Sequence, residues 1–178
     1  MGYERPCKFS MQGSHYIDLA NWFSRSKPRR VSAQLDPFSK IDHRGAFFFD
    51  PEAWVEVTYD NGSTLSMDTR EGGSPAAPGM TLICERGSIF VDVSESSAKI
   101  RKGNDETEIS FEGNRLTWFE NTLDALVSDQ SLFTPCTVEE AIMGLEVIVA
   151  AHVSSQLGGA LMDLPLDSEL SSKVLRIA

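Results

Sequence analysis

Apolar and polar residues alternate in the middle of the chain. Ala53, Val55, Val57 and Tyr59 occupy every second position, and a period of two is typical of a β-strand with one buried face. The next residues are Asp60-Asn61-Gly62, and Asn and Gly tolerate the positive φ angles of a tight turn. The pattern therefore predicts a hairpin in which residues 63–69 pair antiparallel with residues 53–59.

Other short apolar segments predict further strands. One covers residues 31–35, before the hairpin, and a short one lies within residues 161–166. Four more follow the hairpin, at residues 80–85, 88–93, 98–102 and 108–111. Because no helical pattern separates these four, we expect a largely antiparallel sheet of about six strands.

Apolar residues at helical spacing predict three helices. The first covers residues 15–24, with Gly13 and Ser14 as its turn and N-cap, and ends near Lys27 because Pro28 follows. The second covers residues 116–129. The third begins at the capping-box pattern Thr137-x-x-Glu140, is about 20 residues long and ends at Gly158-Gly159. Helices and antiparallel strands together predict an α+β fold, and a chain of 178 residues predicts a single domain over residues 1–178.

Composition and charge exclude several functional classes. The formal charge of −10 opposes binding to nucleic acid. The three cysteines are far apart and predict neither a disulfide framework nor a metal site. No apolar stretch is long enough for a membrane span, and residues 1–10 lack the pattern of a secretory signal. We therefore expect a cytoplasmic protein that binds neither membranes nor metals.

Two segments carry a resemblance to a known family. Residues 13–23 read GSHYIDLANWF, which resembles the Gly-x-His-x-Ile-Asp-Leu segment of the glucose-fructose oxidoreductase, inositol dehydrogenase and MocA family (Gfo/Idh/MocA). Residues 135–141 read PCTVEEA and residues 150–155 read AAHVSS, which look like that family's Pro-x-Thr-x-x-x-Ala helix and its Ala-x-x-Ser ending. The resemblance covers residues 10–167 and lies in the C-terminal domain of the family.

The resemblance implies half of a two-domain enzyme. Family members have an N-terminal Rossmann domain that binds NAD or NADP, and this chain contains no Gly-x-Gly-x-x-Gly motif. The implied enzyme transfers a hydride to or from a sugar, cyclitol or similar polyol, and this chain alone is expected to bind no cofactor and to be inactive. The implied domain has an open sheet with helices packed on one face, and the other face, here with Trp54, is expected to pair with a second copy.

His15 and Asp18 are the candidate site residues. The family's matching histidine lies beside the substrate hydroxyl, so the resemblance implies that His15 is catalytic and that His15 and Asp18 bind substrate. Catalytic members have an aspartate four residues before this histidine, where this chain has Met11, and a thioether cannot take up a proton. From the residues alone, His15 is interpreted as a packed or capping residue near a helix N-terminus, and Asp18 as a hydrogen-bonding residue in the first turns of a helix. With the resemblance, the catalytic and the packed interpretations of His15 are equally favoured.

Three other residues are weaker candidates. Lys27-Pro28 is similar to the family's Glu-Lys-Pro motif, but Lys27 follows a predicted helix and is interpreted as a solvated turn residue. His152 is interpreted as a packed residue of the last long helix, and His43 lies in a loop that the sequence does not place. The alternative function is a non-enzymatic dimerisation or ligand-binding module derived from the same domain.

Overall fold

A computed structural model describes residues 9–36, 51–70, 79–92, 96–110 and 137–172, together with 120, 123 and 127, without the side chains of Met11 and Gln12. The chain divides into two compact units. Unit 1 comprises Met1–Gly73 and Thr137–Ala178, and unit 2 comprises Ser74–Cys136. The single domain over residues 1–178 stays a prediction, and each unit is described by itself.

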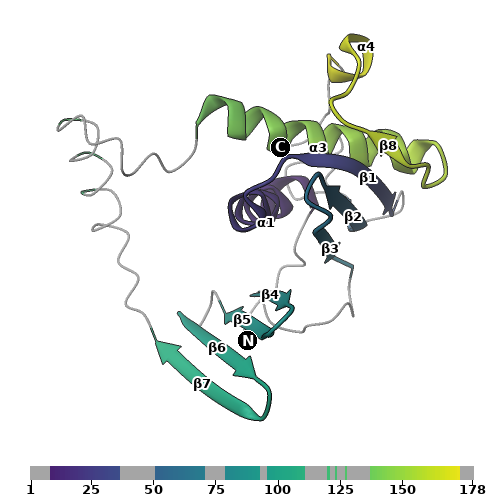
Figure 1. Ribbon diagram of the computed structural model, residues 1–178. Helices are drawn as coiled ribbons and strands as arrows, with labels where there is room; N and C mark the ends of the chain where they lie inside the picture. The colour runs from purple at the N-terminus through teal and green to yellow at the C-terminus, as the bar shows by residue number, and fades with distance from the viewer. Residues whose placement is uncertain are drawn as a thin grey trace, which may run out of the picture. The chain divides into compact units, whose positions relative to one another are not determined.

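Unit 1 contains a four-stranded antiparallel sheet. Its order is β3-β2-β1-β8, with β1 at Pro28–Leu35, β2 at Ala53–Tyr59, β3 at Thr64–Asp68 and β8 at Met162–Asp163 (Figure 1). The predicted hairpin is confirmed: β2 has the predicted bounds, Val55 lies opposite Met67, and Gly62 has a φ of 84° in the turn. The alternation along β2 buries one face and leaves the other face polar or half-buried.

Helices α1 (Phe9–Ser24) and α3 (Val138–Gln156) pack with this sheet. The core is formed by apolar side chains that are almost fully buried, among them Ile17 of α1, Val31 of β1, Val55 and Val57 of β2, and Val147 and Ile148 of α3. Burial of such side chains stabilises the fold by about 1.5–3 kcal/mol each. α4 (Ser168–Ser171) follows β8 and contacts α3.

α1 begins at Phe9, six residues before the predicted start. The prediction used Gly13 and Ser14 as a turn, but Gly13 lies inside the helix. A Cβ atom at Gly13 would lie 3.2 Å from the Met67 side chain and 3.2 Å from the Phe9 ring. A helical glycine here allows close packing against β3, and this tertiary contact outweighs its low helix propensity.

α3 has the predicted ends. The Thr137 hydroxyl accepts a hydrogen bond from the Glu140 backbone N–H (3.1 Å), and the Glu140 carboxylate accepts one from the Thr137 N–H (2.7 Å), which completes the capping box. Gly158 and Gly159 have φ angles of 73° and 89°. The Gly159 N–H donates to the Ser154 carbonyl (2.8 Å), as in a Schellman motif.

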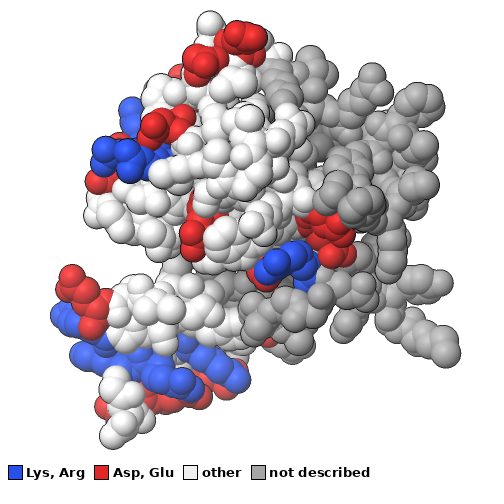
Figure 2. Space-filling model, turned by 90° about the vertical axis from the view of Figure 1, so that its right-hand side faces the viewer, with Lys and Arg blue, Asp and Glu red and all other residues white. Residues whose placement is uncertain are grey.

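Unit 2 contains a second antiparallel sheet with strand order β4-β5-β6-β7. Its strands are β4 (Gly79–Cys84), β5 (Gly87–Asp92), β6 (Ser97–Lys102) and β7 (Asp105–Ser110). The register places seven apolar residues on one face: Met80, Leu82, Ile89, Val91, Ala98, Ile100 and Ile109. The other face carries the ion pairs Arg101–Glu106 (2.7 Å) and Lys99–Glu108 (3.9 Å). Figure 2 shows basic and acidic side chains next to each other on this unit.

The predicted α+β, largely antiparallel fold with helices on one face is confirmed, and its strand count needs a correction. In the described residues, two sheets of four strands replace one sheet of about six, because the hairpin pairs with β1 whereas β4 to β7 pair only with one another. Of the helix predicted over residues 116–129, only Glu120, Leu123 and Val127 are described, and all three are helical. Within the described part, no helix is long and apolar enough to cross a membrane.

Candidate functional site

His15 lies on the solvent side of α1. The helix buries Gly13, Ile17 and Ala20 against the rest of unit 1, and His15 is on the opposite side, exposed to solvent. No hydrogen bond or ion pair engages its ring within the described residues. An imidazole in this position is free to meet a ligand, so His15 is not the packed or capping residue that the alternative interpretation predicts.

Asp18 is one turn further along α1 and is half-buried. It already takes part in another interaction, and no hydrogen bond joins it to His15 in the described part of the chain. Because α1 begins at Phe9, Asp18 lies in the middle of the helix and not in its first turns as predicted. Among the described residues, no three His, Cys, Asp or Glu side chains are close enough to hold a metal ion.

The positions of Met11 and Lys27 can be compared with the family pattern. Met11 belongs to α1, so its position is one turn before His15 in the same helix, where catalytic members have a carboxylate. Lys27 is exposed in the turn between α1 and β1, as predicted. His43 lies outside the described residues.

His152, a residue of α3, packs against the beginning of α1. Its ring centroid is 6.1 Å from that of Phe9, and its Nε2 lies 3.3 Å from the Ser10 hydroxyl. Phe9 is fully buried and His152 is half-buried. The prediction of a packed histidine is confirmed.

The open face of the unit 1 sheet carries Trp54. The register places Trp54 between Gln34 of β1 and Asp68 of β3, and its side chain is half-buried. Arg70 contacts both carboxylate oxygens of Asp68, at 2.8 and 2.6 Å, and these hydrogen bonds hold the pKa of Asp68 below its usual value. A tryptophan among polar groups is typical of a contact surface.

A hollow of about 290 Å³ lies where the end of α1 meets the beginning of α3. Trp22 lines it from α1, Arg25 and Lys27 from the following turn, and Glu140 and Met143 from α3. We call it the α1–α3 hollow. Its volume is at the lower end of the range of small-molecule sites, and it admits a ligand group rather than a large molecule.

Asn21 anchors this end of α1 to the sheet and also lines the hollow. Its Oδ1 accepts a hydrogen bond from the Tyr59 hydroxyl (3.0 Å). Burial raises the pKa of the Tyr59 phenol above its ordinary value, so the phenol stays a donor. The Asn21 Nδ2 is buried and, within the described residues, has no hydrogen-bond partner.

Sequence reasoning did not identify this hollow. Trp22 fits an ordinary residue of an amphipathic helix, and nothing in the local sequence indicates that Arg25 lies near Glu140. The local sequence offers one indication of this site, which is that a tryptophan and two basic residues, Trp22, Arg25 and Lys27, lie within six positions.

Comparison with known proteins identifies the fold. No protein-family model and no curated protein sequence matches the chain. Three solved structures illustrate the structural matches. The aldose-aldose oxidoreductase from Caulobacter crescentus, complexed with glycerol, has a TM-score of 0.68 at 12% identity over 88% of this chain and 47% of its own.

The two other structures are dehydrogenases. The WlbA dehydrogenase from Bordetella pertussis, in complex with NADH and UDP-GlcNAcA, has a TM-score of 0.61 at 18% identity over 90% of this chain and 46% of its own. The UDP-N-acetylglucosamine 3-dehydrogenase GnnA from Acidithiobacillus ferrooxidans has a TM-score of 0.62 at 17% identity over 80% of this chain and 46% of its own. The chain therefore spans about half the length of these proteins.

These matches confirm, at the level of the fold, the resemblance to one half of the Gfo/Idh/MocA-type oxidoreductases.

Proposed function

We propose that this chain, which has the fold of one half of Gfo/Idh/MocA-type oxidoreductases, is the substrate-side domain of an NAD(P)-dependent enzyme acting on a sugar or a related polyol. The observation that carries the proposal is His15. It is exposed on the outer side of α1 without a partner in the described residues, at the position where the family has its substrate-side histidine. The matched proteins act on or bind sugars and glycerol.

The described residues do not fit a dinucleotide. A pyrophosphate binds best at a helix N-terminus that follows a parallel strand and a glycine-rich turn. All strand pairs in the described part are antiparallel. α3 begins with Glu139 and Glu140, whose negative charges oppose a pyrophosphate, and Thr137 already caps its first turn. We therefore assign the nicotinamide cofactor to another domain.

In this proposal His15 exchanges a proton with a substrate hydroxyl. An imidazole can accept or release a proton near neutral pH, and exposure lets a ligand approach the ring. Asp18 is one turn away and accepts hydrogen bonds from neighbouring hydroxyls of the sugar. With Met11 in place of the family's aspartate, His15 acts without a carboxylate at that position.

The test follows the ring resonances of His15 by NMR while single compounds are added to the chain. The panel is glucose, N-acetylglucosamine, myo-inositol and glycerol. Only three histidines are present, so the spectrum of His15→Gln assigns the His15 signal. We expect a saturable shift of His15 with at least one compound, an unchanged His152 signal and a raised melting temperature. No shift of His15 with any compound of the panel would contradict the proposal.

A second candidate function, an assembly module, is favoured by the apolar face of unit 2. Seven apolar side chains share that face, and Ile109 is 47% exposed there. We propose that this face contacts a second copy of the chain and, independently, that the open face around Trp54 in unit 1 does so.

Two exposed isoleucines on opposite faces of the same sheet provide a matched pair of variants. Ile109 lies on the apolar face, and Ile83, which is 86% exposed, lies on the charged face. We expect Ile109→Lys to shift the sedimentation coefficient towards the monomer, and Ile83→Lys to leave it unchanged. Circular dichroism checks that both variants fold. Equal sedimentation of both variants and the original chain would rule out this face as the interface.

A further inference from the structure

The α1–α3 hollow has an excess of positive charge. Arg25 and Lys27, which both line it, are exposed, and neither forms an ion pair within the described residues, in contrast to Arg30. The acidic residue of the hollow is Glu140, whose carboxylate accepts the 2.7 Å hydrogen bond from the Thr137 N–H. Two cations thus stand against one committed carboxylate, in a chain whose formal charge is −10.

Arg25 has a backbone conformation that usually belongs to glycine. α1 ends at Ser24, and Arg25, the next residue, has a φ of 49°. The left-handed residue that follows a helix is most often glycine, because a Cβ atom is strained in this conformation. An arginine here costs stability that a glycine would not cost, and a strained residue of this kind points to a role for its side chain.

The end of α1 does not itself require the two cations. Basic side chains often neutralise the exposed carbonyls at a helix C-terminus. Here the Asn21 carbonyl accepts hydrogen bonds from the Arg25 N–H (3.1 Å) and the Ser24 hydroxyl (3.0 Å). The Ser24 carbonyl accepts one from the Asn61 side chain (3.0 Å). Because backbone and hairpin groups satisfy these carbonyls, the two basic side chains are available to a ligand.

Hydrogen bonds to the hairpin turn also hold the backbone that carries both cations. The Ser26 hydroxyl accepts a hydrogen bond from the Asn61 N–H (3.1 Å), and the Lys27 carbonyl accepts one from the Asp60 N–H (3.0 Å). Arg25 and Lys27 therefore extend from a fixed turn. A fixed turn lowers the entropy that is lost when a ligand binds beside it.

Asn21 places an unpaired donor in the wall of the hollow. Asn21 lines the hollow and is 8% exposed, and its Nδ2 is the buried side-chain atom without a hydrogen-bond partner in the described part. Its Oδ1 accepts the hydrogen bond from the Tyr59 hydroxyl, which fixes the orientation of the amide. A buried donor without an acceptor costs free energy, and an acceptor bound in the hollow removes that cost.

Trp22 and Met143 give the hollow an apolar wall. Trp22 is 66% exposed, with its ring edge-on to Phe23 at a centroid distance of 4.9 Å, and Met143 is half-buried. An inorganic anion gains nothing from such a wall, whereas a ligand with a hydrocarbon or aromatic body buries apolar surface against it. At about 290 Å³, the hollow has room for one small ring.

We propose that the α1–α3 hollow binds a small organic acid, with its carboxylate against Arg25 and Lys27 and its apolar body against Trp22 and Met143. The carboxylate accepts charge-assisted hydrogen bonds from the guanidinium and ammonium groups. It also supplies the acceptor that the Asn21 Nδ2 lacks. The polar and the apolar wall of the hollow thus select a ligand that has both characters.

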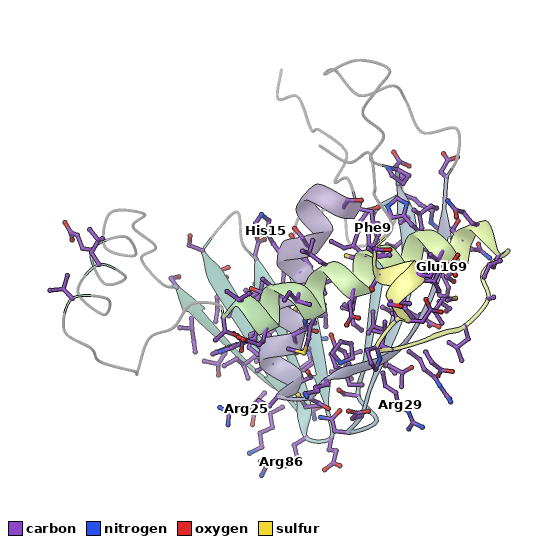
Figure 3. All side chains as sticks on the ribbon, turned by 90° about the horizontal axis from the view of Figure 1, so that it is seen from above. Phe9, His15, Arg25, Arg29, Arg86 and Glu169 are labelled. Carbon is purple, nitrogen blue, oxygen red and sulfur yellow. The ribbon has the colours of Figure 1, made fainter. Side chains whose placement is uncertain are left out.

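This site is separate from the proposed sugar site. The described residues that line the hollow include neither His15 nor Asp18. His15 lies seven positions before Trp22, which is about 10 Å along the helix axis. Figure 3 shows His15 nearer the beginning of α1 and Arg25 at its end. The inference therefore stands or fails independently of the proposed function.

The test measures dissociation constants by NMR titration of the complete chain at pH 7 with three probes: benzoate, benzamide and inorganic phosphate. Benzamide has the ring without the charge, and phosphate has the charge without the ring. We expect benzoate to bind at least tenfold more tightly than either of the other two probes. Benzoate should also shift the indole N–H signal of Trp22, which the spectrum of Trp22→Phe assigns.

Two variants and a control test the cations. Arg25→Gln/Lys27→Gln should weaken benzoate binding at least tenfold and leave benzamide binding unchanged. Arg25→Gly should also weaken benzoate binding, and it should raise the melting temperature of the free chain, because glycine adopts a φ of 49° without strain. The control Arg29→Gln removes an exposed cation at the beginning of β1, which is not among the described residues that line the hollow, and should stay within twofold.

The results that would overturn the inference are distinct. If no probe binds, or if the double variant binds benzoate like Arg29→Gln, the hollow is not an anion site. If phosphate binds as tightly as benzoate, the hollow takes an inorganic anion and the organic acid is wrong. If benzamide binds like benzoate, the cations do not hold a carboxylate. A lowered melting temperature of Arg25→Gly would show that Arg25 serves the fold rather than a ligand.

Discussion

Two serines at the end of α3 accept hydrogen bonds from backbone N–H groups of β1, as a neighbouring strand would do. The Ser154 hydroxyl accepts a hydrogen bond from the Ala33 N–H (2.9 Å) and donates one to the Ala160 carbonyl (2.6 Å). The Ser155 hydroxyl accepts one from the Leu35 N–H (3.0 Å). β8 pairs only with Arg30 and Val31, so the serines satisfy backbone groups that it does not reach. This is a physical reason for the Ala-x-x-Ser ending.

Replacing Ser154 by alanine should destabilise unit 1 strongly. Ser154 is fully buried, and its loss leaves the Ala33 N–H and the Ala160 carbonyl without partners, at a cost of about 2–3 kcal/mol. Ser155→Ala is the matched control and should cost about 1 kcal/mol, because Ser155 is half-buried and water can replace it. Urea unfolding measures both. If both variants lose the same free energy of unfolding, the two buried hydrogen bonds of Ser154 do not stabilise the fold more than the single bond of Ser155, which would contradict the prediction.

Tyr59 should make the protein less stable at alkaline pH. Burial raises the pKa of its phenol in the folded chain, whereas in the unfolded chain the phenol ionises near pH 10. Above that pH the unfolded state loses a proton that the folded state retains, so the free energy of unfolding falls. Tyr59→Phe should be less stable at pH 8 by about 1 kcal/mol, for the lost bond to Asn21. Between pH 9 and 11, the free energy of unfolding of Tyr59→Phe should fall less than that of the original chain. Urea titrations in which both proteins lose the same free energy of unfolding over this pH range would contradict the prediction.

At the scale of elements, helices and strands could be predicted where the signal lies in neighbouring residues, and not where it depends on contacts with distant residues. β2 was predicted with its bounds because alternation and the Asn-Gly turn are both local signals. The capping box of α3 was predicted because Thr137 and Glu140 are three residues apart. The start of α1 was missed because the helical conformation at Gly13 depends on Met67, which lies in a distant strand. The α1–α3 hollow was missed for the same reason, since it depends on how two helices pack.

The capping box of α3 should contribute about 1 kcal/mol to stability. Thr137→Ala removes the acceptor for the Glu140 N–H, and the loss of an N-cap costs about that much. Asp167→Ala removes the corresponding bond to the Leu170 N–H (2.8 Å) at α4. Because α4 has four residues and none of them is buried, this control should change the free energy of unfolding much less. A larger effect of Asp167→Ala in thermal unfolding would contradict this assignment.

At the scale of the whole molecule, the two units differ in how completely their strands are buried. In unit 1, Val31, Val55 and Val57 are fully buried, whereas every residue of β5 is only half-buried and β7 is entirely exposed. Full burial makes local opening more costly. The exposure of β7 follows from its sequence, DETEIS, in which Ile109 is the one apolar residue. The half-burial of β5 was not predictable, because its sequence, GSIFVD, contains the apolar run Ile89-Phe90-Val91.

Hydrogen exchange should separate the two sheets. Amides of β1 and β2 should exchange more slowly than those of β5 and β6 by at least tenfold, because local opening of unit 1 exposes more apolar surface. Mass spectrometry of peptides from each sheet measures the rates. Equal protection would indicate that both sheets open in one cooperative step, and would contradict this expectation.

The serine contacts along β1 also bear on aggregation. An uncovered strand edge is a template on which another chain adds a strand, and proteins protect such edges to avoid cross-β assembly. Ser154 and Ser155 block this template at β1 with side chains. At the opposite edge of the sheet, β3 is short and exposes Thr64, Ser66 and Asp68. Loss of the two serines together would therefore open a strand edge to other chains, with fibrous precipitation as its consequence.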